Sequence, residues 1–95
     1  MDLSKKQLDE IAGIVKKYLP EHRVFIFGSR AQNKHFPSSD LDVGVMGKQV
    51  VLGNIKVRIE EELENSDLPF KIDLVDFKTV SPEFCQLALQ KTINI

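Results

Sequence analysis

The order of apolar and polar residues divides this chain into helical and strand-like segments. After Ser4, apolar side chains recur every three or four positions, which predicts an amphipathic helix over about residues 5–18 that ends before Pro20. Ser4 and Gln7 have the spacing of a capping box, which supports a helix start at this point. The same helical spacing returns over residues 49–64, with charged residues on the other faces, and predicts a second long helix.

Three short apolar runs predict β-strands. They cover Arg23–Phe27, Leu41–Met46 and about Phe70–Phe77, and they are rich in the β-branched and aromatic residues that strands favour. Helices and strands alternate in the order α-β-α-β-α-β-α once the two shorter helices described next are included. The expected fold class is therefore α/β, with a small sheet and flanking helices.

The segment between the first two strands contains turn signals. Gly28 and Ser29 end the first strand in a tight turn, and a short helix is expected from Arg30 to about Asn33. Residues 34–39 have the composition of a loop, which returns the chain so that the second strand can begin beside the turn.

The C-terminal segment predicts a final helix. Ser81 and Pro82 suit its N-cap and first position, and apolar residues continue the helical spacing through Ala88, or as far as Lys91. Residues 92–95 fit either a short edge strand or a frayed tail, and the sequence leaves these two alternatives open.

Length and composition narrow the class of protein. The 95 residues, 42% of them hydrophobic, are expected to form a single domain over residues 1–95. The sequence has neither an apolar run of transmembrane length nor a signal-peptide pattern, so a cytoplasmic protein is expected. A formal net charge of −1 argues against a broad nucleic-acid surface. The single cysteine, Cys85, has no internal disulfide partner and is expected to pack as a small apolar residue.

Two aspartates of the second strand are the first candidates for chemistry. Asp40 and Asp42 are two positions apart, so both side chains point to one face of an extended segment. Leu41, Val43 and Val45 point to the other face and are expected in the core. Aspartate is depleted in strands, and binding of a divalent cation explains such a pair because hard cations prefer carboxylate oxygens. A loop-capping role is the structural alternative.

The Gly28-Ser29 turn is a second candidate. Glycine has no Cβ to keep the backbone away from an anion, and the free N–H groups at the start of a following helix attract negative charge. Such a turn can therefore hold a phosphate. Arg30, next in the sequence, is either a further phosphate contact or a solvated side chain.

In the third strand, the phase of the side chains selects Asp73. Asp76 shares a face with the apolar Ile72 and Leu74, whereas Asp73 lies on the opposite face. If the apolar faces of the second and third strands pack under the same helices, only Asp73 joins the aspartate pair of the second strand. Asp76 is expected to cap the turn that follows its own strand.

The ordered set of these features resembles a known family. A Gly-Ser turn, ten residues between Ser29 and Asp40, an Asp-x-Asp strand and a third carboxylate strand resemble the signature of the DNA polymerase β-like nucleotidyltransferase superfamily. The short length is similar to its minimal nucleotidyltransferase branch, whose members are commonly encoded beside a HEPN-domain protein as a toxin–antitoxin pair. The resemblance covers nearly the whole chain and implies a mixed rather than an all-parallel sheet.

The resemblance also implies a site and its cofactors. Catalysis and the binding of two Mg²⁺ ions would fall to Asp40, Asp42 and Asp73. Binding of the ATP triphosphate would fall to Gly28, Ser29 and Arg30. Three carboxylates that converge on one face repel one another, and divalent cations relieve that repulsion.

The implied activity is magnesium-dependent transfer of AMP from ATP to a hydroxyl of a partner HEPN toxin, with tyrosine as the acceptor, so that the chain acts as an antitoxin. Larger relatives carry a second domain for the base or the acceptor, so here a partner in a hetero-oligomer is expected to supply that surface. One alternative is a binding module that silences the HEPN partner by complex formation alone. Another is a subunit that modifies a small molecule or a nucleic acid, against which the near-neutral charge counts.

Overall fold

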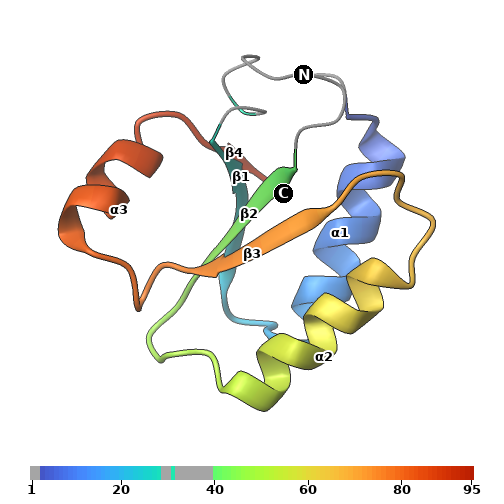
Figure 1. The fold of residues 1–95 in the computed structure, drawn as a ribbon, viewed down its shortest axis with the longest axis horizontal. Helices are drawn as coiled ribbons and strands as arrows, with labels where there is room; N and C mark the ends of the chain where they lie inside the picture. Colours follow the sequence, from blue (N-terminus) through green and yellow to red (C-terminus); the bar gives the residue numbers. More distant parts are fainter. Residues whose placement is uncertain (1–2, 29–30, 32–39) are drawn as a thin grey trace.

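The structure is a computed structural model that describes residues 3–28, 31 and 40–95. Three helices and four strands follow one another along these residues (Figure 1). The helices are α1 (Lys5–Tyr18), α2 (Gly53–Glu64) and α3 (Pro82–Ala88). The strands are β1 (Arg23–Phe27), β2 (Leu41–Met46), β3 (Ile72–Asp76) and β4 (Ile93–Asn94).

The four strands form one mixed sheet in the order β3-β2-β1-β4. Strand β1 is antiparallel to β2 and to β4, whereas β2 and β3 are parallel. The α/β class and the mixed sheet are thereby confirmed. The short edge strand is also the correct alternative for the C-terminus, since Ile93 and Asn94 pair with Ile26 and Phe25 of β1.

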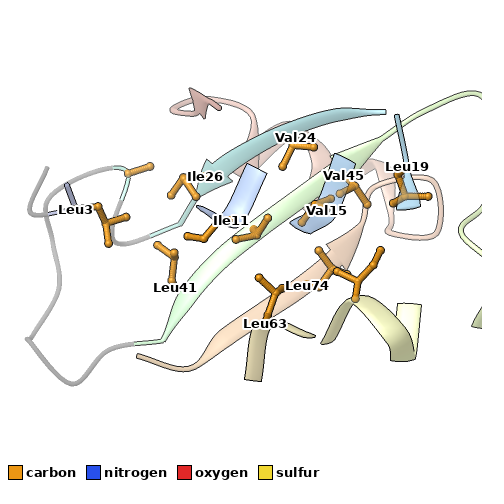
Figure 2. Close-up of a cluster of buried hydrophobic side chains, with 13 residues drawn as sticks. Leu3, Ile11, Val15, Leu19, Val24, Ile26, Leu41, Val45, Leu63 and Leu74 are labelled. Atoms are coloured by element: carbon orange, nitrogen blue, oxygen red, sulfur yellow. The ribbon is translucent and has the colours of Figure 1, made fainter. Parts of the chain in front are cut away.

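Helices α1 and α2 cover one face of the sheet and enclose the main core (Figure 1). Leu41, Val43 and Val45 of β2 are fully buried on this face, as the side-chain phase predicts. Figure 2 shows how Ile11 and Val15 of α1 meet side chains from the strands in this cluster. Removal of these apolar surfaces from water is the main force that holds the helices on the sheet.

The opposite face of the sheet carries an aromatic cluster under α3. Phe25 and Phe27 of β1 pack with Phe77, with ring centroids 4.9 and 5.0 Å from that of Phe77. Phe84 of α3 lies edge-on to Phe27 at 6.0 Å. Cys85 packs against the same cluster, so its predicted apolar role is confirmed. No residue of α3 is fully buried, and on the same face of the sheet Asp42 is half-buried and Asp73 is exposed.

The second long helix begins later than the sequence predicts. Residues 49–52 are not helical, and Leu52 is an extended N-cap with φ −64° and ψ 142°. The physical reason lies in Asp76, whose Oδ2 accepts a hydrogen bond from the Val51 N–H at 2.9 Å. This long-range contact holds the backbone before Gly53 in an extended form, where helical spacing alone favours a helix.

The other predicted boundaries differ by a few residues. The third strand is Ile72–Asp76, shorter than the predicted 70–77, and α3 ends at Ala88 and does not reach Lys91. The first helix matches its prediction, including the capping box between Ser4 and Gln7. The predicted short helix 30–33 and loop 34–39 lie outside the described residues, apart from Ala31, which is buried. Among the described helices, none has the length and apolar character needed to cross a membrane.

Candidate active site

Strands β2 and β3 bring two of the predicted aspartates side by side. Asp42 and Asp73 are register partners in this parallel pair, and neighbouring strands lie about 4.8 Å apart. The adjacent pair, Val43 and Leu74, is buried under α1 and α2. Because side chains alternate along a strand, Asp42 and Asp73 point to the opposite face, the one that carries the aromatic cluster.

The two carboxylates differ in exposure. Asp42 is half-buried on the central strand β2, and Asp73 is exposed on the edge strand β3. Asp40 lies one residue before β2, is exposed, and has the same phase as Asp42. The next backbone N–H, that of Leu41, donates to the Lys71 carbonyl at 2.9 Å, which continues the pairing of the two segments at this end of the sheet.

The charges of the other two aspartates act on Asp42. The pKa of Asp42 is raised above its ordinary value, mainly because burial disfavours the charged form and further because the Asp73 and Asp40 carboxylates are negative. The surroundings of Asp42 therefore disfavour its charged form. A bound cation would favour its charged form.

Gly28, the first residue of the predicted phosphate turn, lies directly beside Asp42. Gly28 has φ +78°, a conformation that side chains rarely adopt. A Cβ atom at this position would collide with the Asp42 carboxylate and would lie 3.2 Å from its Cγ. The preceding residue, Phe27, is the register partner of Asp42 in the β1–β2 pair. Ser29 and Arg30, the other two predicted nucleotide-binding residues, lie outside the described residues.

The chemical type of the candidate ligands suits magnesium. Carboxylate oxygens are the ligands that Mg²⁺ prefers, and it is commonly held by one or two carboxylates together with substrate phosphates. Asp42 and Asp73 supply two such carboxylates at one level of the sheet. Within residues 3–28, 31 and 40–95, however, no three His, Cys, Asp or Glu side chains are gathered closely enough to hold a metal ion. The predicted three-carboxylate site therefore stays a prediction.

Asp76 has a structural role, as its phase predicts. Its side chain is buried, Oδ1 accepts from the Lys78 N–H at 2.9 Å, and Oδ2 accepts from the Val51 N–H at the same distance. The predicted turn cap is confirmed by the bond to Lys78. The Asp76 carboxylate therefore binds the backbone of two connecting segments and does not join the other three aspartates.

The aromatic border of the site was not predicted. Phe27 on β1 is the neighbour of Asp42, and Phe84 of α3 packs edge-on against Phe27. We call these two aromatic side chains, which extend from Asp42 to α3, the aromatic wall. The alternation of Phe25 and Phe27 along β1 was an available signal, because register with β2 places both on the face of Asp42. That register is a long-range property, which the local pattern does not specify.

Comparison with known proteins places this chain in a family. The sequence model of the family described as polymerase beta, nucleotidyltransferase matches residues 9–95. A protein of Haemophilus influenzae named probable protein adenylyltransferase MntA is 30% identical over 87 residues, which cover 92% of this chain and 76% of the relative.

Solved structures of other proteins have the same fold. One is a toxin–antitoxin complex with AMP-PNP, in which the similar chain is 23% identical with a TM-score of 0.77, over 90% of this chain and 69% of that one. Another is a tri-AMPylated Shewanella oneidensis HEPN toxin in complex with an MNT antitoxin, at 21% identity and a TM-score of 0.69, over 90% and 66% of the two chains. These structures establish the fold. The family match over residues 9–95 shows that the chain belongs to the polymerase beta nucleotidyltransferase family.

Proposed function

We propose that this chain is a magnesium-dependent adenylyltransferase that transfers AMP from ATP to a tyrosine hydroxyl of a HEPN-domain partner and thereby acts as an antitoxin. The observation that carries the proposal is the register partnership of Asp42 and Asp73 beside the Gly28 turn. The names of the relatives support it, since one is a probable protein adenylyltransferase and another is bound to an AMPylated HEPN toxin.

The reaction is a substitution at phosphorus. The acceptor hydroxyl oxygen forms a bond to the α-phosphorus of ATP, and the bond from that phosphorus to the α,β-bridging oxygen breaks. Pyrophosphate leaves with the bond electrons, and the hydroxyl proton passes to a nearby base, for which the exposed Asp73 is the candidate. Bound Mg²⁺ would neutralise the triphosphate and stabilise the leaving pyrophosphate.

Each residue of the site has a role in this scheme. Gly28 would let the triphosphate approach the backbone, with Ser29 and Arg30 as further phosphate contacts. Asp40 and Asp42 would hold the metal ions, and the half-buried position of Asp42 fixes it between the phosphate turn and β3. The third carboxylate, on the edge strand, would complete the ligand set on the side from which an acceptor can approach.

The experiment is a labelling assay with the full chain. The protein is mixed with α-labelled ATP, Mg²⁺ and a HEPN-domain toxin, and label on the toxin is measured over time. Wild type should transfer label and Asp42→Asn should not, while Asp9→Asn on the exposed surface of α1 serves as the matched control and should equal wild type. Equal labelling by wild type and Asp42→Asn would reject the mechanism.

A second function, neutralisation by binding alone, is favoured by one observation. The similar solved chains are partners in toxin–antitoxin complexes. If Asp40→Asn and Asp73→Asn variants neutralise a co-expressed HEPN toxin in cells as well as wild type does, complex formation suffices and transfer is dispensable.

A further inference from the structure

A pocket of about 660 Å³ opens between the C-terminal half of α2 and the start of β3, where these segments lie beside each other in Figure 1. Its apolar surface comes from Val57 and Leu63 on α2, from Leu68 and Phe70 in the connection, and from Ile72 on β3. Ile72 directly precedes Asp73 in the sequence. The pocket therefore opens at the start of the edge strand that carries Asp73. It lies on the side of the sheet that α1 and α2 cover, whereas the Asp73 side chain points to the other side.

The rim of this pocket is acidic. Three glutamates line it, Glu60, Glu61 and Glu64, against a single lysine, Lys71. Within the part of the chain that the structure describes, none of these glutamates forms an ion pair, in contrast to Glu62, which pairs with Lys17 of α1. We call this feature, an apolar floor with a glutamate rim, the acidic pocket.

The glutamates on the pocket rim are not placed where they would stabilise helix α2. The C-terminal end of a helix carries partial negative charge, so acidic side chains there are repelled and basic ones are favoured. The last turn of α2 nevertheless contains no basic residue, while glutamate occupies positions 60–62 and 64. The charge at this end of α2 opposes the helix dipole and suits a cationic partner.

We propose that the acidic pocket docks a basic amphipathic segment of the acceptor protein. Its cationic side chains would pair with Glu61 and Glu64, and its apolar side chains would cover Val57 and Leu68. The inference rests on the proposed adenylyl transfer for the identity of the partner. Docking at this position would hold the acceptor at the edge of β3, and a segment of the acceptor would pass around this edge strand to reach Asp73 on the other face of the sheet.

A peptide titration tests the binding step without any assumption about activity. The probe is a 14-residue helical Leu/Lys peptide, about 21 Å long, and the control peptide has glutamate in place of every lysine. Amide signals of the ¹⁵N-labelled full chain are followed during each titration. The Leu/Lys peptide should shift signals within residues 57–72, and the Leu/Glu peptide should not. Shifts concentrated elsewhere, or equal shifts with both peptides, would overturn the inference.

A matched pair of variants sharpens the test. Glu61→Lys/Glu64→Lys reverses two charges on the pocket rim, and Asp9→Lys/Glu21→Lys reverses two exposed charges away from it. The pocket variant should weaken the Leu/Lys peptide at least tenfold, and the control variant less than twofold. Because lysine suits the C-terminal end of α2, unfolding does not account for such a loss. Equal weakening in the two variants would show general charge attraction and reject the pocket.

The labelling assay separates this inference from the proposed function. In the pocket variant, KM for the HEPN acceptor should rise about tenfold while KM for ATP stays unchanged. If wild type transfers label and the pocket variant keeps the wild-type KM for the acceptor, the docking inference fails and the transfer function stands. If wild type transfers no label but the peptide still binds the pocket selectively, the transfer function fails and the docking site stands.

Discussion

Gly28 and Asp42 face each other so closely that a Cβ atom on residue 28 would collide with the Asp42 carboxylate. The φ of +78° at Gly28 adds backbone strain for any other residue. Gly28→Ala should therefore lower the free energy of unfolding by about 1–3 kcal/mol. It should also slow adenylyl transfer about 100-fold, since a shift of a catalytic group by about 1 Å can have this effect. Urea denaturation and initial rates measure the two effects.

Gly13→Ala is the matched control for the change at Gly28. Gly13 lies inside α1, and a Cβ atom there would meet nothing within 4 Å. The substitution should raise the free energy of unfolding by about 1 kcal/mol, because alanine is the better helix former, and the transfer rate should stay the same. A Gly28→Ala protein that matched wild type in stability and rate would show that the close approach to Asp42 is unimportant.

The raised pKa of Asp42 predicts a pH-dependent stability. The folded state binds this proton more tightly than the unfolded state, so the free energy of unfolding falls as pH rises from the ordinary carboxyl value of 3.8 through the raised value. At a pH above the raised pKa, Asp42 is ionised in the folded protein and the free energy of unfolding has fallen by its full amount. Asp42→Asn has no such titration. In metal-free buffer the variant should therefore exceed wild type in stability near pH 7, and the advantage should vanish below pH 3.8. A constant difference across pH would contradict this origin.

Magnesium should reverse that order of stability. A ligand that binds only the folded state stabilises it in proportion to the logarithm of its concentration. In the presence of ATP analogue, added Mg²⁺ should raise the Tm of wild type by several degrees and that of Asp42→Asn by much less, as measured by scanning calorimetry. Ca²⁺, which also prefers oxygen ligands but tolerates a larger coordination shell, is a useful comparison. Equal stabilisation of the two proteins would place the ion elsewhere.

The sequence predicted those parts of the fold that depend on local patterns. The capping box of Ser4 and Gln7, the extent of α1 and the first two strands follow from spacing and propensity, and the structure confirms them. Alternation along a strand is a local rule and both neighbours of Asp73 are apolar, so the sequence correctly predicted that Asp73 and Asp76 lie on opposite faces.

The parts that were wrong depend on contacts between distant residues. The start of α2 was misplaced because the Asp76 side chain binds the Val51 N–H, 25 positions away in the sequence. The aromatic wall beside Asp42 was missed because strand register decides which side chains become neighbours across a sheet. The choice between an edge strand and a tail at residues 93–94 likewise required the pairing with β1.

Substitution of Asp76 should affect mainly stability, and substitution of Asp73 should affect mainly catalysis. Asp76→Ala removes the acceptor for two backbone N–H groups, those of Val51 and Lys78, and should lower the free energy of unfolding by about 2–4 kcal/mol. Asp73→Ala changes an exposed side chain and should alter stability by less than about 0.5 kcal/mol, yet it should abolish transfer. Urea denaturation and the rate per folded molecule measure both. Loss of transfer by the folded Asp76→Ala protein would assign that residue to the site.

The charge at the end of α2 gives a prediction about stability alone. Glu64 is exposed in the last turn, where the helix dipole disfavours a negative side chain. Glu64→Lys should raise the free energy of unfolding by about 0.3–1 kcal/mol at low ionic strength. The gain should shrink in 1 M salt, because the Debye length falls to about 3 Å. If Glu64→Lys destabilised the protein at low salt, Glu64 would be held by a contact that folding requires, and its acidity would need no partner to explain it.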